Sequence, residues 1–371
     1  MDLKKYIIDS SIELGIDIIG FTSCEPFAHL EEMLTNRRKQ NHETEFEHSS
    51  ISDRITPSML MPECRTIIVI GVSYNTGFRN KDINTTPHGK LSKSSWGMDY
   101  HDILKNKMEL LVEKIKKVKD LRYVISVDTS PIIDREVAKK AGIGWYGKNC
   151  SIINDDYGSF IFIGHIITDL LMRYDVESES KCGECSLCVR ACPTKAIQEG
   201  YRINAKHCIS YLTQTKEWIP YELREKMGAK VYGCDVCQLV CPKNKGVKLG
   251  NTDEFIPNIT NGNINIEELF NMSNKEYRDK YGNMSGSWRG KNILKRNCLI
   301  SLGNMKDKTS LDLLKAAIND PSSLVREYAA WAILKTDYNI GCEIINSHLN
   351  KEKDDKVIEE MKRLLRYFSD K

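Results

Sequence analysis

The sequence lacks the signatures of exported and membrane-spanning proteins. Its first nine residues contain no apolar core of a secretory signal, and no hydrophobic run is long enough to cross a bilayer. We therefore expect a cytoplasmic protein in a reducing compartment, with no membrane partner and no disulfides. The formal net charge of +3 is nearly balanced, so charge neither demands nor excludes a nucleic-acid partner.

A dinucleotide-binding fingerprint is also missing. The glycines of Gly142-Ile-Gly144-Trp-Tyr-Gly147 have G-x-G-x-x-G spacing, but they follow a predicted helix, whereas the fingerprint follows a strand and opens a helix. What remains is an ordinary globular composition, 41% hydrophobic and 28% charged. At 371 residues the chain is long enough for two or three domains.

Cysteine is abundant: the chain has thirteen, and eight of them follow ferredoxin spacing. The run from Cys182 to Pro193 is C-x2-C-x2-C-x3-C-P, which holds a cubane iron-sulfur cluster. Cys208 and the run from Cys234 to Pro242 supply the other four. In two-cluster ferredoxins the fourth cysteine of a run binds the neighbouring cluster. The spacing therefore predicts two 4Fe-4S clusters, one on Cys182, Cys185, Cys188 and Cys241 and the other on Cys192, Cys208, Cys234 and Cys237.

Structural zinc and disulfides are the alternatives for these cysteines. Zinc sites use four ligands in two pairs, whereas two runs here end in Cys-Pro, so the spacing favours iron-sulfur clusters. The remaining cysteines lie in apolar stretches, and we expect them to be small core residues: Cys24, Cys64, Cys150, Cys298 and Cys342. Because every iron of the two clusters would already have its protein ligand, they would carry single electrons, and the reaction would take place elsewhere.

The N-terminal part alternates helices with strands. Apolar spacing predicts helices over 3–15, 99–119 and 132–142, strands over 16–21, 66–73, 122–128 and 159–169, and a loop over 75–97. This alternation predicts a three-layer α/β domain over residues 1–175. Asp128 and Asp169 end two of the strands, and the carboxyl ends of parallel strands are where such domains place ligand chemistry.

Two further domains are predicted after the α/β domain. An acidic linker opens a ferredoxin-like two-cluster domain over residues 176–245. Residues 246–371 are predicted to be all-helical, with one helix ending at the glycine of Gly303-Asn304. The turn at Pro321 and the following Val325-Arg-Glu-Tyr-Ala-Ala-Trp-Ala are typical of a HEAT-like repeat, which builds concave surfaces for macromolecular partners. A plain helical cap without a partner is the alternative.

These three blocks, in this order, resemble the epoxyqueuosine reductases. These are cobalamin-dependent iron-sulfur enzymes that finish the queuosine base at the wobble position of certain tRNAs. The resemblance covers essentially the whole chain. It is carried by Asp99-Tyr-His, the block from Asp128 to Asn149, Tyr157-Gly-Ser-Phe with Thr168-Asp169, the eight cysteines, and the segments Arg296 to Asn304 and Val325 to Ala332.

The resemblance implies a cofactor and partners that the composition alone does not indicate. The sequence has no D-x-H-x-x-G stretch to supply a histidine to cobalt, so the implied cobalamin is bound base-off in the α/β domain. The implied substrate is a tRNA with a GUN anticodon that carries epoxyqueuosine. Its reduction to queuosine would use low-valent cobalt, and the electrons would reach the clusters from a reductant such as flavodoxin or ferredoxin. We expect a monomer.

By the same resemblance, Asp134 is the acid that delivers a proton to the departing epoxide oxygen. Its place early in a helix would lower its pKa, whereas burial against a corrin would raise it, as a general acid requires. The alternative is that Asp134 only pairs with Arg135 or Lys139. The resemblance also places six further residues at the cofactor: Arg54, Tyr100, His101, Gly158, Ser159 and Asp169.

Basic residues of the C-terminal part are expected to contact tRNA phosphates. They are Arg289, Lys291, Lys295, Arg296 and Arg326. Two other functions compete with this reading. A small-molecule enzyme like the reductive dehalogenases would share the cofactor domain and clusters but not the helical tail. The second alternative is an electron carrier on a HEAT scaffold. That function would not explain the presence of the α/β domain.

Overall fold

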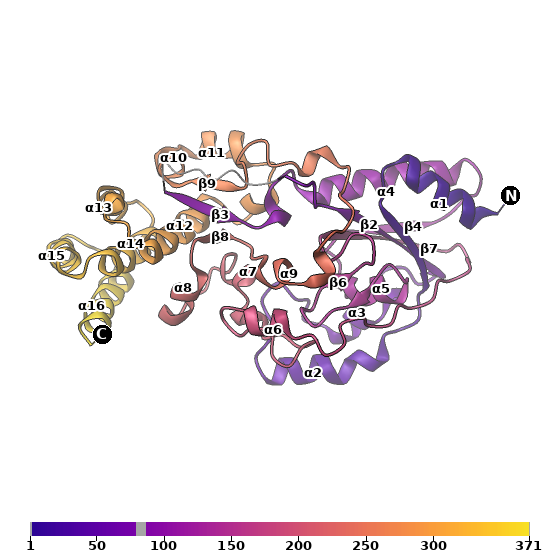
Figure 1. Ribbon diagram of the computed structural model, residues 1–371, viewed down its shortest axis with the longest axis horizontal. Coiled ribbons are helices and arrows are strands. Elements are labelled where there is room, and N and C mark those ends of the chain that lie inside the picture. Colours follow the sequence, from indigo (N-terminus) through magenta and orange to yellow (C-terminus); the bar gives the residue numbers. More distant parts are fainter. Residues whose placement is uncertain (1, 79–86, 371) are drawn as a thin grey trace. The chain divides into compact units, whose positions relative to one another are not determined.

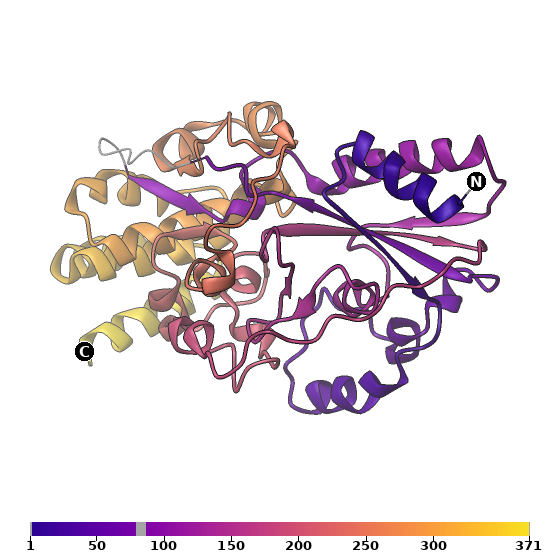
Figure 2. The same cartoon turned by 45° about the vertical axis from the view of Figure 1, so that its right-hand side comes forward.

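A computed structural model describes residues 2–78 and 87–370 (Figures 1 and 2). The chain forms two compact units, and each is assembled from three segments. The first unit comprises Met1–Phe78, Met98–Cys208 and Asp235–Ile256. The second comprises Arg79–Gly97, Ile209–Cys234 and Pro257–Lys371. The predicted domains 1–175, 176–245 and 246–371 stay predictions.

The first unit is built on a four-stranded sheet in the order β1-β2-β7-β4. Its strands are β1 (Ile18–Ser23), β2 (Thr66–Ser73), β4 (Tyr123–Ser126) and β7 (Ile161–Thr168). All four coincide with predicted strands, but the expected parallel arrangement is wrong. Each neighbouring pair is antiparallel, and the full length of β2 pairs with β7 from Thr66↔Thr168 to Ser73↔Ile161. Alternating helices and strands do not fix strand direction, because a long connection can return a strand either way.

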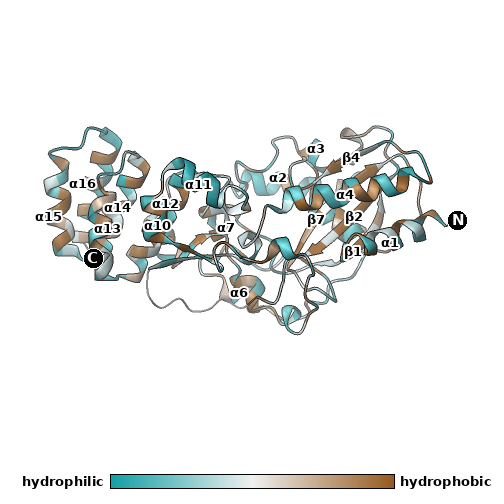
Figure 3. Cartoon of the chain, turned by 90° about the horizontal axis from the view of Figure 1, so that it is seen from above, coloured by the Kyte–Doolittle hydropathy of each residue, from teal (hydrophilic) through white to brown (hydrophobic). Residues whose placement is uncertain are grey.

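Helices cover both faces of this sheet, as a three-layer arrangement requires (Figures 1 and 2). Ile68, Ile70 and Val72 of β2 pack in a core with residues of α1 and α4, whereas Ile67 and Val69 pack with residues of α2, α3 and α5. Figure 3 shows polar and apolar residues alternating around α4. The helices are α1 (Leu3–Glu13), α2 (Glu31–Lys39), α3 (Ile51–Ile55), α4 (Tyr100–Lys116) and α5 (Asp134–Lys140).

A disulfide links Cys24 to Cys64, contrary to the expectation that both are free core residues. The register of β1 and β2 explains the contact. Ser23 pairs with Thr66, so the residues just beyond them face each other at the same end of the two strands. The two Cα atoms are 6.0 Å apart, within the range that a disulfide spans.

The cysteine-rich segments of the first unit form two short helices that pack together, α6 (Leu187–Ala191) and α9 (Val236–Leu239). A two-stranded hairpin of β5 (Trp145–Tyr146) and β6 (Ile152–Ile153) also belongs to this unit. No helix among the residues described has the length and apolar character needed to cross a membrane.

The second unit contains a three-stranded sheet and a set of helices. Its strands are β8 (Lys230–Tyr232), β3 (His88–Leu91) and β9 (Asn263–Asn265), in that order. The predicted loop over 75–97 therefore contains a strand, and its residues 79–86 lie outside the described residues. The helices next to this sheet in sequence are α7 (Ile209–Leu212), α8 (Tyr221–Met227), α10 (Ile266–Asn271) and α11 (Asn274–Tyr281).

From α12 (Lys291–Met305) onward the chain is helical, as predicted, but the all-helical prediction for residues 246–371 is wrong at β9. The helices that follow α12 are α13 (Leu311–Ala317), α14 (Ser323–Thr336), α15 (Tyr338–Leu349) and α16 (Asp355–Ser369). Gly303 does not end α12, which continues to Met305 and is followed by Lys306 in the left-handed conformation. A Cβ at Gly303 would lie 2.7 Å from the Trp331 ring, so this glycine serves close packing against α14.

Candidate active site

Helix α5 places Asp134 over the middle of β7. Residues Ile161, Ile163 and Ile167 of β7 face the core on the α5 side, and alternation along the strand puts His165 on the same side. The carboxylate oxygen Oδ1 of Asp134 lies 3.2 Å from Nδ1 of His165. The His165 side chain is 1% exposed and that of Asp134 is 21% exposed, so the pair lies at the boundary of the core.

The environment of this pair favours uncharged side chains. Burial raises the pKa of Asp134 well above its usual range, and the negative charge of Asp128 raises it further, although Arg135 opposes this. Burial lowers the pKa of His165 to about 4, so the imidazole is neutral at neutral pH. A carboxyl group that keeps its proton near neutral pH is suited to act as a general acid.

Asp128 connects this pair to the opposite face of the sheet. It follows β4 with φ +52°, in the left-handed region, and its Oδ2 accepts a hydrogen bond of 2.7 Å from the Tyr100 hydroxyl. The Tyr100 ring stacks on Phe162 of β7 with a centroid distance of 4.2 Å. His101, the next residue, is held by Asp99 through a contact of 2.7 Å between Nδ1 and Oδ1. These residues gather where β2 and β4 end and β7 begins.

The thiols of the first predicted cluster lie near one another. Burial raises the pKa of Cys188, and the neighbouring thiols of Cys241 and Cys182 add to this effect. Cys241 is affected in the same way by Cys182 and Cys185. The amide of Lys148 also donates to the sulfur of Cys182 at 3.5 Å. These four thiols affect one another's pKa, as ligands of one 4Fe-4S cluster would, and their assignment to one cluster stays a prediction.

Two family models match the chain. Residues 54–129 match "Epoxyqueuosine reductase QueG, DUF1730", and residues 181–244 match "4Fe-4S double cluster binding domain". The epoxyqueuosine reductase of Bacillus cereus is 38% identical over 373 residues, which cover 100% of this chain and 98% of the relative. The Bacillus subtilis enzyme is 38% identical over 96% of this chain and 93% of its own length. The chain belongs to the epoxyqueuosine reductase family.

Solved structures of the family agree with this fold. A crystal structure of epoxyqueuosine reductase with an epoxyqueuosine-modified tRNA-Tyr stem loop matches with a TM-score of 0.93 and 37% identity, over 99% of both chains. The Bacillus subtilis enzyme with the Asp134 catalytic loop swung out of the active site matches with a TM-score of 0.92 and 37% identity, over 98% of both chains. The family model over residues 181–244 also shows that this member carries the domain that binds two 4Fe-4S clusters.

Of the cofactor residues predicted for this epoxyqueuosine reductase family member, Tyr100 and His101 lie at the same end of the sheet as Asp134. Asp99 does cap α4, because its side chain accepts from the His101 amide at 3.1 Å. Its hydrogen bond to the ring also raises the pKa of His101. Of the two alternative partners of Asp134, Lys139 forms an ion pair of 2.7 Å with Glu177, whereas the charge of Arg135 acts on Asp134 and opposes the rise of its pKa.

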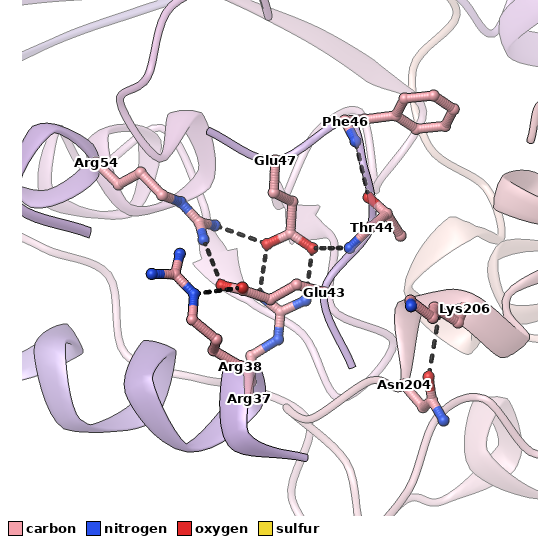
Figure 4. Close-up of polar contacts among 9 residues, drawn as sticks. All are labelled: Arg37, Arg38, Glu43, Thr44, Phe46, Glu47, Arg54, Asn204 and Lys206. Atoms are coloured by element: carbon pink, nitrogen blue, oxygen red, sulfur yellow. Dashed lines mark hydrogen bonds and ion pairs between the residues drawn. The ribbon is translucent and has the colours of Figure 1, made fainter. Parts of the chain in front are cut away.

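Arg54 forms ion pairs inside the protein, and its expected contact with a phosphate of the cofactor or of the tRNA stays a prediction. Its guanidinium, in a residue only 7% exposed, lies 3.1 Å from Glu43 and 2.8 Å from Glu47 (Figure 4). Glu47 also receives two hydrogen bonds from Arg37. This network holds the segment between α2 and α3 and leaves Arg54 no free charge.

Gly158 and Ser159 lie against other groups of the protein, and their predicted contacts with the cofactor stay predictions. Ser159 is 4% exposed, and its amide donates to Asn244 Oδ1 at 2.7 Å. Its hydroxyl and carbonyl oxygens accept hydrogen bonds from Gln238. Gly158 has φ +64°, and a Cβ there would lie 2.1 Å from Asn244 Oδ1. The close approach that this glycine permits is therefore to Asn244.

Asp169 does not lie beside Asp128, where parallel strands would have placed it, and its predicted cofactor contact stays a prediction. Asp169 follows Thr168, which pairs with Thr66 at the start of β2 and Tyr123 at the start of β4. Asp169 therefore lies at the opposite end of the sheet from Asp128. There it accepts from the amide of Arg122 at 3.0 Å and from its side chain at 3.1 Å.

The basic side chains of the C-terminal part that were expected to contact tRNA phosphates also have partners inside the protein. Arg296 is fully buried and donates to the carbonyls of Leu212 and Thr215, so its prediction is wrong. Lys295, 6% exposed, pairs with Asp320 at 2.8 Å. The others are bonded as well: Arg326 to Glu352, Lys291 to the Met272 carbonyl, and Arg289 to the Gln214 carbonyl.

Sequence reasoning missed His165 as a member of the site. A signal for it existed, since a histidine in the middle of the apolar run Ile161–Thr168 is a polar group that needs a partner inside the core. Asp128 was noted only as a strand end, and its effect on Asp134 required the three-dimensional arrangement.

Proposed function

We propose that this chain reduces epoxyqueuosine to queuosine at the wobble position of tRNAs with GUN anticodons. Removal of the epoxide oxygen as water consumes two electrons and two protons. The 4Fe-4S domain supplies a path for the electrons, one at a time, and Asp134 supplies a proton to the departing oxygen.

The observation that carries the proposal is the raised pKa of Asp134, beside His165, in a chain of this family. Two causes, burial and the charge of Asp128, shift this pKa upward, which is the direction that a general acid needs. A Bacillus subtilis relative has been described with an "Asp134 catalytic loop" in its active site. This chain has an aspartate of the same number, at the start of α5.

Cobalamin is the cofactor that we propose beside Asp134. Its corrin ring carries amide side chains, and the half-exposed Asp99, Tyr100, His101 and the exposed Asp128 offer suitable donors and acceptors at this end of the sheet. When bound base-off, it would supply low-valent cobalt to the epoxide. The chain's own residues orient the amides and hold the proton on Asp134.

The proposed partners are the tRNA and an electron donor. A structure of the family with a modified tRNA stem loop supports an anticodon-loop substrate, whose base would have to be splayed out to reach Asp134. Helices α12–α16 would act as a HEAT-like surface for the tRNA. Flavodoxin or ferredoxin is the proposed reductant, and the protein would work as a cytoplasmic monomer.

The test is anaerobic turnover of a tRNA stem loop carrying epoxyqueuosine, with cobalamin and a chemical reductant, comparing the wild type with Asp134→Asn. Queuosine formation by the wild type and its loss in the variant, with iron and corrin retained in both, would support the proposal. An inactive wild type that instead dehalogenates a small molecule would overturn it.

A further inference from the structure

His165 is a buried imidazole whose ring lies against the carboxylate and the backbone of Asp134. It lies among isoleucines of β7, is 1% exposed, and neither ring nitrogen has a hydrogen-bond partner among the residues described. A buried polar group without a partner costs on the order of 1–3 kcal/mol. A leucine would fill the same place in the strand without that cost, so the imidazole needs another explanation.

The nearest polar atom to this ring belongs to Asp134. Nδ1 lies 3.2 Å from Asp134 Oδ1, close enough for a hydrogen bond, but the two groups are not aligned and Oδ1 is also unbonded among the described residues. Contacts between catalytic groups are often misaligned before the substrate binds and tighten afterwards. A rotation of the Asp134 carboxyl would complete this bond.

The carboxyl has a closed side and an open side. Oδ1 is buried and faces His165, whereas the Asp134 side chain as a whole keeps 21% exposure. A proton delivered to a substrate must therefore leave from the side away from His165. We infer that His165 positions the acid: its neutral ring donates from Nδ1 to Oδ1 of Asp134 and keeps the transferable proton on Oδ2. This inference rests on the proposed role of Asp134.

Charged groups around the pair are few. Asp128 beyond β4 repels the Asp134 carboxylate and forms a hydrogen bond that favours the protonated carboxyl, and Arg135 on α5 attracts the carboxylate. Arg135 is in turn hydrogen-bonded to Tyr146 of β5. The other strands packed against α5 contribute Ile67 and Val69 of β2, Ile18 of β1 and Ile152 of β6. His165 is therefore the one neutral donor that this face supplies to Asp134 among the described residues, and its removal should be visible in the titration of the acid.

The variants His165→Leu and His165→Gln separate positioning from packing. Leucine removes the donor, whereas glutamine restores an N–H donor that cannot titrate in this range. We expect His165→Leu to lower the single-turnover rate about 10–100-fold, the usual effect of losing a group that orients a catalytic residue. We also expect the alkaline limb of the pH–rate profile of His165→Leu to move to higher pH, because the Asp134 carboxylate loses a hydrogen bond that favours its charged form. Glutamine should return both quantities toward the wild type.

Infrared titration of the protonated Asp134 carboxyl, identified by its loss in Asp134→Asn, gives a readout without turnover. A titration of His165→Leu shifted to higher pH would support the inference, and coincident titrations of His165→Leu, His165→Gln and the wild type would overturn it. Should the leucine variant not fold, the glutamine variant decides alone: a rate within twofold of the wild type supports a donor role, and a loss as large as that of Asp134→Asn contradicts it. Failure of the proposed function would show separately, as a wild type that does not consume epoxyqueuosine.

Discussion

The hydroxyl of Tyr100 donates to Oδ2 of Asp128 over 2.7 Å and so joins the start of α4 to the turn after β4. This bond fixes a carboxylate at the end of the sheet where Asp134 lies. The negative charge of Asp128 then contributes to the raised pKa of Asp134, after burial. The acid therefore depends on a residue that need not touch the substrate.

Replacing Asp128 with asparagine should lower the pKa of Asp134. The charge that opposes ionisation disappears, so Asp134 would lose its proton at lower pH and the alkaline limb of the activity profile would move down. A pH profile of single-turnover rates measures this shift. The exposed Asp120→Asn is the matched control, and an unmoved limb in Asp128→Asn would show that the two carboxyls do not interact.

Asp134→Asn should stabilise the protein at neutral pH while abolishing activity. The pKa of Asp134 is raised in the folded state above the unfolded value of about 3.9. The native state therefore binds the proton more tightly, and its stability falls as pH rises from about 4 through the folded-state pKa. We expect the variant to gain about 1–3 kcal/mol at alkaline pH, because an uncharged amide avoids the cost of burying the carboxylate charge. Denaturant unfolding at acid and alkaline pH tests this, and a gain of equal size at both would contradict it.

Double substitutions test the exchange of ligands between the clusters. Cys182→Ser and Cys241→Ser affect the same predicted cluster, although the residues are far apart in sequence. Their combination should remove no more iron than either alone, about half of the total. Cys188→Ser with Cys192→Ser, which are near in sequence, should remove nearly all of it. Iron analysis and the visible absorption band measure both, and Cys342→Ser should retain the full content.

Glu360→Ala should destabilise the helical part by about 3–5 kcal/mol, because it leaves a buried arginine without its charge partner. Oε1 of Glu360 accepts from Trp218, Tyr221 and the fully buried Arg224. Its neighbour Glu359, 72% exposed and 3.5 Å from Arg363, is the matched control and should change stability by less than about 0.5 kcal/mol. Equal effects of the two substitutions would show that the network around Arg224 contributes little.

Features set by local sequence patterns could be predicted from the sequence. The placement of residues that depends on strand direction could not. The apolar run at 66–73 coincides with β2, and the spacing of the cysteines agrees with the family model of the two-cluster domain. Asp134 was placed near the start of a helix, where it lies. Asp169 was misplaced because a strand's apolar pattern is the same in either direction, and only pairing reveals which end meets the site.

Buried cations were the second source of error. Arg296 and Lys295 lie on α12 among polar residues, and in sequence they resemble a solvated helix face. In the structure, Arg296 instead donates to carbonyls at the end of α7 and just after it, and these residues are more than eighty positions away in sequence. The sequence carries no local sign of such partners, so exposed and buried arginines of this helix could not be distinguished.

The first unit is not complete until its last segment, Asp235–Ile256, has joined the other two. Ser159 is bonded to Gln238 and Asn244 of that segment, which the ribosome releases some eighty residues later. During synthesis the sheet and its helices therefore lack this segment, and the surroundings of Ser159 stay uncovered, while a stretch of the second unit is made. A fragment that stops at residue 175 would leave the amide of Ser159 and the apolar surface around it facing water, and would be a natural substrate for chaperones.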